Sequence, residues 1–290
     1  MLSAKLEKER QGGRHPQPAA RKRPQDPGLG VEGFLLEYRE DDLIIRMKRG
    51  IVLAFVLWGI TMAVLGQDTL KVMTYNVRHC AGMDMVLDYD RTAAVITMQQ
   101  PDVVALQELD SMTGRSEHRY QLGELASRTQ YHPVFGAAID YDGGKYGVGI
   151  LTRETPLSIK HIPLPGDEPR VLLVVELQDY VMACTHLDLE EDPRLASVPL
   201  IVKEAQRWQK PFILAGDWND TPESELLREL GKHFTILSDS EASYPADEPQ
   251  DCLDYVALFK SLSVETLEST VIDEPEASDH RPMVVKVKLK

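Results

Sequence analysis

The chain has 290 residues, is 43% hydrophobic and carries a formal net charge of −14, a composition that supports a large core and excludes a wholly disordered protein. Residues 1–66 hold 11 basic and 8 acidic residues, so the 21 basic and 38 acidic residues that remain give the rest of the chain a net charge of −17. Such a body repels nucleic-acid phosphates, and because no Lys/Arg cluster interleaved with aromatic residues is present, the composition argues against tight binding to duplex DNA.

The first 66 residues differ from the rest. Residues 1–46 show no persistent apolar period, and we expect them to be disordered or to be an upstream extension outside the natural product. Met47-Lys48-Arg49 then precedes an apolar stretch from Ile51 to Leu65, which predicts a signal peptide over 47–66 and export to the periplasm or the medium. The alternative, a membrane anchor, is disfavoured because the stretch is short for a hydrocarbon layer of about 30 Å.

The remaining residues, 67–290, are predicted to form a single domain of many strands and few helices. Apolar runs bounded by turn residues predict strands at 69–77, 103–106, 134–139, 146–151, 172–177, 180–184, 212–215, 256–259 and 283–289. Helical periodicity predicts helices at 91–100, 120–128, 195–208 and 223–230. Two pairs of strands form hairpins, so the pattern favours a layered α/β (α+β) sandwich with mixed sheets over a doubly wound parallel sheet.

Three cysteines, Cys80, Cys184 and Cys252, show no CxxC spacing, so a zinc site is not expected. They allow at most one internal disulfide, for which Cys80–Cys252 is a candidate. Cys184 lies in an apolar run and is predicted to be a small buried hydrophobic residue.

Polar residues that can bind a metal or transfer a proton follow the apolar runs. If the strands lie side by side, their ends bring these residues to one rim, and the group suits a hard divalent cation with acid–base chemistry on a phosphate ester. Each residue alone also has an ordinary interpretation, such as an exposed strand end, an Asx-turn or a packed histidine, so the hypothesis rests on the set. Its members are Asn76, Glu108, His186, Asp217, Asn219, Asp254, Asp279 and His280.

The segment Gly216-Asp217-Trp218-Asn219 is the sharpest of these signals. Glycine lets the backbone turn after a strand, and Asp217 and Asn219 then point the same way, where an acceptor and a donor can orient a water. Asp279 and His280 are adjacent and must serve different functions. Asp254 is a candidate to hold His280 in one tautomer.

Six ordered motifs resemble those of the endonuclease/exonuclease/phosphatase family and cover residues 70–290. The resemblance implies a four-layered α/β/β/α sandwich of the DNase I type with two mixed sheets and the site at one end. The motifs are Tyr75-Asn76, Leu106-Gln107-Glu108, Thr185-His186-Leu187, Gly216-Asp217-Trp218-Asn219, Leu253-Asp254-Tyr255 and Ser278-Asp279-His280.

The resemblance also implies site roles. It implies Mg²⁺, with Mn²⁺ or Ca²⁺ as alternatives, held chiefly by Glu108 with Asn76 and Asp279 near it. Asp217 and Asn219 would align the attacking water. His186 and His280 would polarise the phosphoryl oxygens, with Asp254 paired to His280.

The same resemblance suggests four substrate-binding residues. Tyr146, after the Gly143-Gly144 turn, is expected to reach the substrate. Arg78 stands where several family members carry an acidic residue, which puts a second metal position in doubt. Arg78, His79 and Arg115 are instead candidate donors to a substrate phosphate.

Family resemblance implies a metal-dependent phosphoesterase but does not choose its substrate. The acidic body and predicted export favour a phosphorylated small molecule or a lipid head group, acted on by a monomer. The alternative is a secreted nuclease, whose groove would be lined by Arg78, Arg115, Arg119 and Lys145. A non-catalytic binding module on the same fold is disfavoured, because no catalytic position is lost.

Overall fold

A computed structural model describes residues 69–260 and 264–288. The predicted signal peptide and the segment before it lie outside the described residues. The described residues form one compact unit. Among the described residues, no helix is long and apolar enough to cross a membrane.

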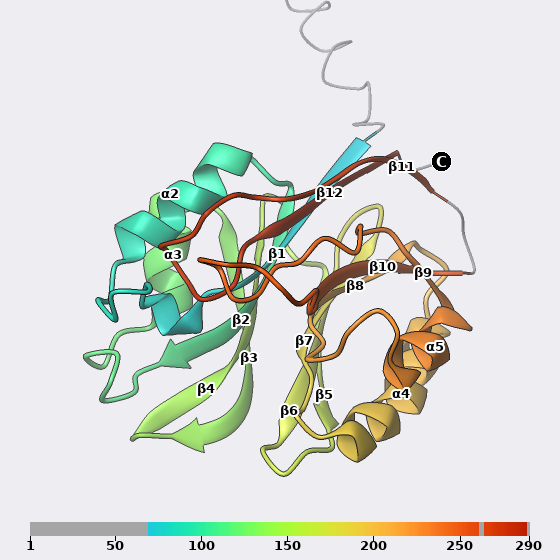
Figure 1. Cartoon of the computed structure of the whole chain (residues 1–290), viewed down its shortest axis with the longest axis horizontal. Coiled ribbons are helices and arrows are strands. Elements are labelled where there is room, and N and C mark those ends of the chain that lie inside the picture. The colour runs from blue at the N-terminus through green and yellow to red at the C-terminus, as the bar shows by residue number, and fades with distance from the viewer. Residues whose placement is uncertain (1–68, 261–263, 289–290) are drawn as a thin grey trace, which may run out of the picture. The chain divides into compact units, whose positions relative to one another are not determined.

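The described residues contain two six-stranded sheets (Figure 1). The first has the order β11-β12-β1-β2-β4-β3, and β1 and β2 are its parallel pair. Its strands are β1 (Thr69–Asn76), β2 (Val103–Ser111), β3 (His132–Tyr141), β4 (Gly144–Thr152), β11 (Glu265–Val271) and β12 (Met283–Lys288).

The second sheet has the order β5-β6-β7-β8-β10-β9, and its parallel pair is β7 and β8. All other neighbours in both sheets are antiparallel, so both sheets are mixed, as predicted. Its strands are β5 (Ser158–Leu164), β6 (Arg170–Glu176), β7 (Val181–His186), β8 (Phe212–Asp217), β9 (Phe234–Ile236) and β10 (Asp254–Phe259).

Helices cover the outer face of each sheet, which gives four layers (Figure 1). The first sheet carries η1 (Arg78–Cys80), α2 (Tyr89–Gln99) and α3 (Gln121–Thr129), and the second carries α4 (Glu191–Ala205) and α5 (Glu225–Gly231). One hydrophobic cluster joins the two sheets, and two others join each sheet to its own helices. The predicted α/β/β/α sandwich is therefore confirmed.

Several sequence predictions need correction. Strands β5, β9 and β11 were not predicted, because β5 and β11 are largely exposed edge strands and β9 has only three residues. The strand predicted at 103–106 continues to Ser111. The helix predicted at 195–208 begins at Glu191, with two prolines inside its span.

The candidate Cys80–Cys252 disulfide is also wrong. Cys80, Cys184 and Cys252 are buried and free. Cys80 packs between the first sheet and its helices, whereas Cys252 packs between the second sheet and its helices. The two thiols therefore belong to opposite outer layers of the sandwich, and no bridge can join them.

Candidate active site

The candidate site lies where strand ends of the two sheets meet. Asn76 is the last residue of β1, and Asp217 is the last residue of β8. The Nδ2 atom of Asn76 donates to the Oδ2 atom of Asp217 at 3.0 Å, which joins the two sheets directly. His186 ends β7, and Asp254 begins β10 opposite Asp217, so the strand pairing brings these residues to one edge as predicted.

A β-bulge positions Glu108. In the β2–β4 ladder Leu106 pairs with Gly149 and Leu109 with Gly147, so Gln107 and Glu108 together oppose a single residue. Glu108 has a φ of 59°, a conformation that is uncommon for a residue with a side chain. The carboxylate therefore leaves the alternation of β2 and accepts a hydrogen bond from Asn76 Nδ2 at 3.1 Å. Glu108 lies within the strand rather than at its end, which corrects the sequence prediction.

Gly216 allows the close approach of β7 and β8 beside Asp217. A Cβ atom at this position would lie 1.9 Å from the carbonyl oxygen of Thr185, and the φ of Gly216 is 155°. No other residue fits there without moving a strand. The requirement for glycine immediately before Asp217 thus has a steric cause.

Asp217 is the centre of the polar network. Its side chain is 1% exposed, and its Oδ2 atom lies 3.6 Å from Nε2 of His186 and 3.6 Å from Nε2 of His280. Its Oδ1 atom accepts a hydrogen bond from the backbone N–H of Asn219 at 2.9 Å. A carboxylate held among these partners can orient a water.

Asn219 is held next to this carboxylate. Its φ is 53°, and its Nδ2 atom donates to the carbonyl oxygen of Leu187 at 2.8 Å. The hydrogen bond fixes the amide group and leaves its oxygen and its second N–H available to a substrate or water. The carboxylate of the neighbouring Asp220 accepts a hydrogen bond from Nε of Arg194 at 3.0 Å.

His186 and His280 differ in protonation state. Burial lowers the pKa of His186 to about 4, so this imidazole is neutral at pH 7. Burial would also lower the pKa of His280, but the charges of Asp254 and Asp217 outweigh it and raise the pKa to about 10. Two histidines in one site therefore provide a neutral imidazole and an imidazolium.

Asp254 orients the imidazolium. Its Oδ2 atom accepts hydrogen bonds from His280 Nδ1 at 2.8 Å and from the hydroxyl of Ser243 at 2.6 Å. The ring of Tyr244 lies 4.8 Å from that of His280, centroid to centroid. His280 Nε2 is thereby directed toward Asp217 and the rim, as the predicted pairing with Asp254 requires.

Asp279 and Arg78 form an ion pair at the edge of the site. The Nε atom of Arg78 lies 3.3 Å from Asp279 Oδ2, and both side chains are about one quarter exposed, at 28% and 26%. The Ser278 hydroxyl donates to the backbone oxygen of Asn76 at 2.7 Å, which ties the 278–280 segment to β1. Arg78 thus lies in the site, but it neutralises a carboxylate that was predicted to face a metal.

The three other predicted substrate-binding residues lie together on the β2–β4 side. Arg115 makes a bidentate ion pair with the buried Asp110, through Nε at 2.7 Å and Nη2 at 2.8 Å. Its guanidinium lies 5.6 Å from the ring centroid of Tyr146. Burial, and next the charge of Arg115, lower the pKa of His79, so His79 is a neutral neighbour of this group.

Sequence reasoning missed Arg170 and Ser243. Arg170 is 7% exposed, and its Nη1 atom, which can only donate, lies 3.5 Å from Nδ1 of His186. A basic residue at the start of the apolar run 171–175 was the available signal. Its proximity to His186 follows from the antiparallel pairing of β6 and β7. Ser243 lies in an irregular loop, for which the sequence offered no signal.

Carboxylates suited to a divalent cation are present on both sides of Asp217. Burial raises the pKa of Glu108, and the charges of Asp279 and Asp217 raise it further, so a cation beside this carboxylate would relieve a real electrostatic cost. Ligand atoms of Asp217, Asp254 and His280 also lie within 4.8 Å of one another. His280 is protonated there and bonded to Asp254, which disfavours it as a metal ligand.

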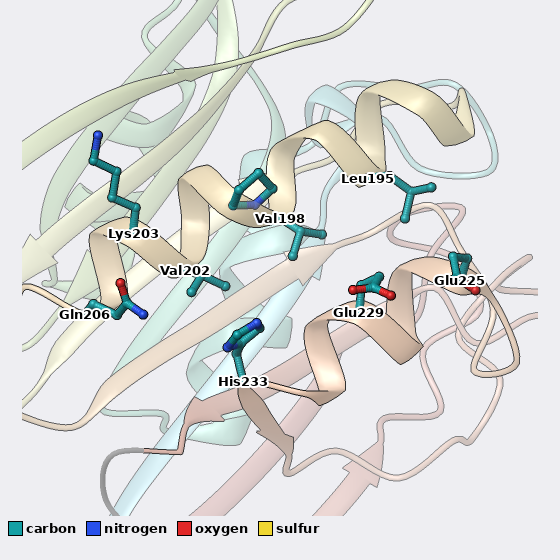
Figure 2. Close-up of a pocket in the computed structure, with 9 residues that line it drawn as sticks. Leu195, Val198, Val202, Lys203, Gln206, Glu225, Glu229 and His233 are labelled. Atoms are coloured by element: carbon teal, nitrogen blue, oxygen red, sulfur yellow. The ribbon is translucent and has the colours of Figure 1, made fainter.

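A separate pocket lies among the helices of the second sheet. A groove of about 540 Å³ lies between α4 and α5, where Val198 and Val202 face Glu229 and His233 (Figure 2). None of its lining residues belongs to the network around Asp217. The groove therefore plays no part in the chemistry of the candidate site.

The fold and sequence were compared with known proteins. A model of the endonuclease/exonuclease/phosphatase family matches residues 73–280. No curated protein matches closely enough to count as a relative. Among solved structures, an endonuclease/exonuclease/phosphatase from Beutenbergia cavernae is 24% identical, with 76% of this chain and 72% of that chain covered and a TM-score of 0.64.

Two further structures are similar in fold. The mannosyl-6-phosphatase of Bacteroides thetaiotaomicron is 16% identical, with 76% of this chain and all of that chain covered and a TM-score of 0.64. The catalytic domain of human Nocturnin, with bound sulfate, is 17% identical, with 77% and 95% covered and a TM-score of 0.58. The family match spans well over half of the residues, and so the chain belongs to the endonuclease/exonuclease/phosphatase family of phosphoesterase-type hydrolases.

Proposed function

We propose that the protein is a divalent-metal-dependent hydrolase of a phosphate ester on a small molecule or lipid head group. The proposal rests on one observation: side chains of Asn76, His186 and His280, from both sheets, converge on the Oδ2 atom of Asp217. Burying this set of ionisable groups costs folding free energy, and a catalytic function accounts for retaining it.

The residues divide the work of an in-line attack by water. Asp217, as base or positioning group, and Asn219 orient the water, and His280 offers a cationic N–H to a phosphoryl oxygen. Arg170, which also pairs with Glu168 at 2.9 Å, positions a donor beside the neutral ring of His186. Arg78, His79, Arg115 and Tyr146 lie on the substrate side.

Glu108 would hold the cation, with Asp279 and the side chain of Asn76 beside it. Mg²⁺ is the ion we propose, with Mn²⁺ or Ca²⁺ as alternatives, because carboxylate and amide oxygens suit hard cations. When bound, the ion supplies positive charge for the phosphoryl oxygens and the leaving oxygen.

A small substrate is favoured over nucleic acid by the pairing of the candidate groove cations. Arg78 pairs with Asp279, Arg115 with Asp110, Arg119 with Glu124 and Lys145 with Asp140. Four cations that are already neutralised by carboxylates offer little attraction to a phosphate backbone. The similar fold of a mannosyl-6-phosphatase agrees with a phosphorylated small molecule. We further propose an exported protein that acts as a monomer.

The test is hydrolysis by the purified full chain of p-nitrophenyl phosphate and bis-p-nitrophenyl phosphate, with Mg²⁺, with Mn²⁺ and with EDTA. We expect metal-dependent turnover that Asp217→Asn lowers by at least about a thousandfold, because the oriented carboxylate is lost. Asp239→Asn, at an exposed position outside the site, is the matched control and should retain full activity.

Two results would contradict the proposal. Preference for single-stranded or duplex DNA over both small esters would establish the nuclease instead. Absence of turnover on esters and DNA with every metal would favour a binding module on this fold.

A further inference from the structure

Two connections form a single wall beside the candidate site. The loop at 112–119 follows β2, and the turn at 142–143 joins β3 to β4. The backbone N–H of Gly114 donates to the carbonyl oxygen of Asp142 at 2.9 Å, and the backbone N–H of Arg115 donates to the Asp142 carboxylate at 2.7 Å. The shape of the wall is therefore set before any substrate binds.

Arg115 links two aromatic rings within this wall. Its guanidinium lies 4.5 Å from the centroid of Tyr141 and 5.6 Å from that of Tyr146, while Asp110 fixes it from the buried side. The two rings are 6.2 Å apart. Tyr146 also borders a small cavity with Arg170 and His186, so the wall adjoins the part of the candidate site that holds His186.

An open hollow of about 500 Å³ lies at the outer end of the wall, lined by the 111–112 and 140–145 segments. Tyr141 is 40% exposed and Met112 is 51% exposed at its edge. Asp140 and Asp142 bring hydrogen-bond acceptors to the hollow, and Lys145 brings donors.

The mixture of groups decides what the hollow can bind. A hydroxyl both donates and accepts, so alternating carboxylates and cations around an aromatic face suit a ring that carries many hydroxyls. Its lining cation, Lys145, is already paired with Asp140, so the hollow offers little attraction to a second phosphate.

We propose that this wall binds the hydroxyl-rich organic group of the ester, so that the substrate is a phosphorylated sugar or polyol, and Tyr141 is a specificity-determining residue. The proposal rests on the hydrolase function proposed above and adds the chemistry of the group attached to the phosphate.

The test compares two esters with the same kind of leaving oxygen. For the full chain with Mg²⁺ or Mn²⁺, kcat/KM is measured for a hexose 6-phosphate and for ethyl phosphate, and for the methyl diester of each. We expect the hexose ester to be preferred, and Tyr141→Ala to lower the ratio of the two kcat/KM values about tenfold, mainly through KM of the hexose ester. Tyr141→Phe should keep the ratio, and so should Met98→Ala, an exposed control on α2.

Two further comparisons separate the polyol from the alternative substrates. Phosphatidylinositol vesicles, compared with phosphatidylcholine vesicles, show whether the polyol belongs to a lipid head group. Adenosine 5′-phosphate preferred over the hexose ester, with that preference lost in Tyr141→Ala, would overturn the polyol assignment in favour of a base.

The failure of this inference is distinguishable from failure of the hydrolase function. Equal activity on ethyl and hexose esters, or an unchanged ratio in Tyr141→Ala, overturns the inference while the hydrolase stands. Absence of hydrolysis of any ester overturns both.

Discussion

Asp217 shows how single residues acquire their function from the fold. Its partners Asn76, His186 and His280 are separated from it by up to 141 positions along the sequence, yet their polar atoms lie within 3.0–3.6 Å of its Oδ2 atom. The sequence predicted Asn76 and His186 because each follows an apolar run, and His280 because it lies just before the final strand. It did not predict which residue would be central, because that depends on how the two sheets meet.

Residues whose partners come from strand pairing or irregular loops were harder to predict. Arg170 lies beside His186 only because β6 and β7 pair, and Ser243 reaches Asp254 from a loop with no periodic pattern. Arg78 was predicted as a phosphate donor, and its ion pair with Asp279 depends on the segment before β12 lying against β1.

A prediction at this scale concerns the imidazolium of His280. In Asp254→Asn the nearest charge that raises the pKa of His280 is removed, while its burial remains. Burial is then opposed only by the charges of Asp217 and Asp279, so we expect the pKa to fall from about 10 toward its ordinary value and the charged fraction of His280 at pH 7 to shrink. We expect kcat to fall at least about a hundredfold at pH 7, since a charged donor to the phosphoryl group is lost.

Titration of the imidazole protons by nuclear magnetic resonance, together with steady-state kinetics, would measure both effects. Asp251→Asn, an exposed position on the same loop, is the control and should change neither. A lowered pKa with unchanged kcat would show that the charge on His280 plays no part in turnover.

At the scale of elements, hydrogen bonds and an ion pair around Asp110 hold β2 to the loop that follows it. Asp110 is fully buried and accepts hydrogen bonds from Thr113 at 2.8 Å and Ser116 at 2.5 Å in addition to its ion pair with Arg115. The strand was predicted only as far as Leu106, because the polar residues at 107–111 break the apolar run. Tertiary contacts, not local pattern, extend it.

Asp110→Asn tests this network through stability and its pH dependence. Burial would raise the pKa of Asp110, but its hydrogen bonds, from Arg115 first, outweigh burial and lower the pKa. The ionised carboxylate therefore contributes stability above its unfolded pKa of about 3.9, and this contribution is lost as the pH falls through the lower folded pKa. We expect the variant to lose about 1–2 kcal/mol at pH 7, a value reduced because Arg115 is 32% exposed.

Urea unfolding of both proteins between pH 7 and pH 3 would measure the difference. We expect the gap between them to narrow below about pH 4, whereas Asp239→Asn, with an exposed carboxylate, should match the parent throughout. A gap of constant size across this range would mean that Asp110 acts through its shape rather than its charge.

Over the whole molecule, the sandwich holds two apolar sheets together and concentrates negative charge at one edge of their junction. The hydrophobic cluster between the sheets draws on β1, β2 and β12 from one sheet and on β7, β8 and β10 from the other. The pattern of few helices and adjacent hairpins predicted a layered sandwich with mixed sheets, and the family resemblance implied the order of its four layers. The pairing of the edge strands was not, because β9 and β11 carry little apolar pattern.

A cation at this junction should stabilise the fold, and this can be measured without substrate. Binding to the folded state alone contributes about 2.7 kcal/mol when the ion is present at a hundred times its dissociation constant. For a domain of this size we expect Mg²⁺ or Mn²⁺ to raise Tm by about 5–10 °C relative to EDTA. Calorimetry or thermal unfolding followed by circular dichroism would measure the shift.

Glu108→Gln distinguishes the proposed ligand from the rest of the carboxylates. Because burial raises the pKa of Glu108, its charge costs folding free energy in the absence of a cation. We therefore expect the variant in EDTA to be at least as stable as the parent, and its Tm to be insensitive to Mg²⁺ and Mn²⁺. Glu117→Gln, at an exposed position, should retain the full metal response. A metal response that persists in Glu108→Gln would place the cation elsewhere, with the group Asp217, Asp254 and His280 as the next candidate among the described residues.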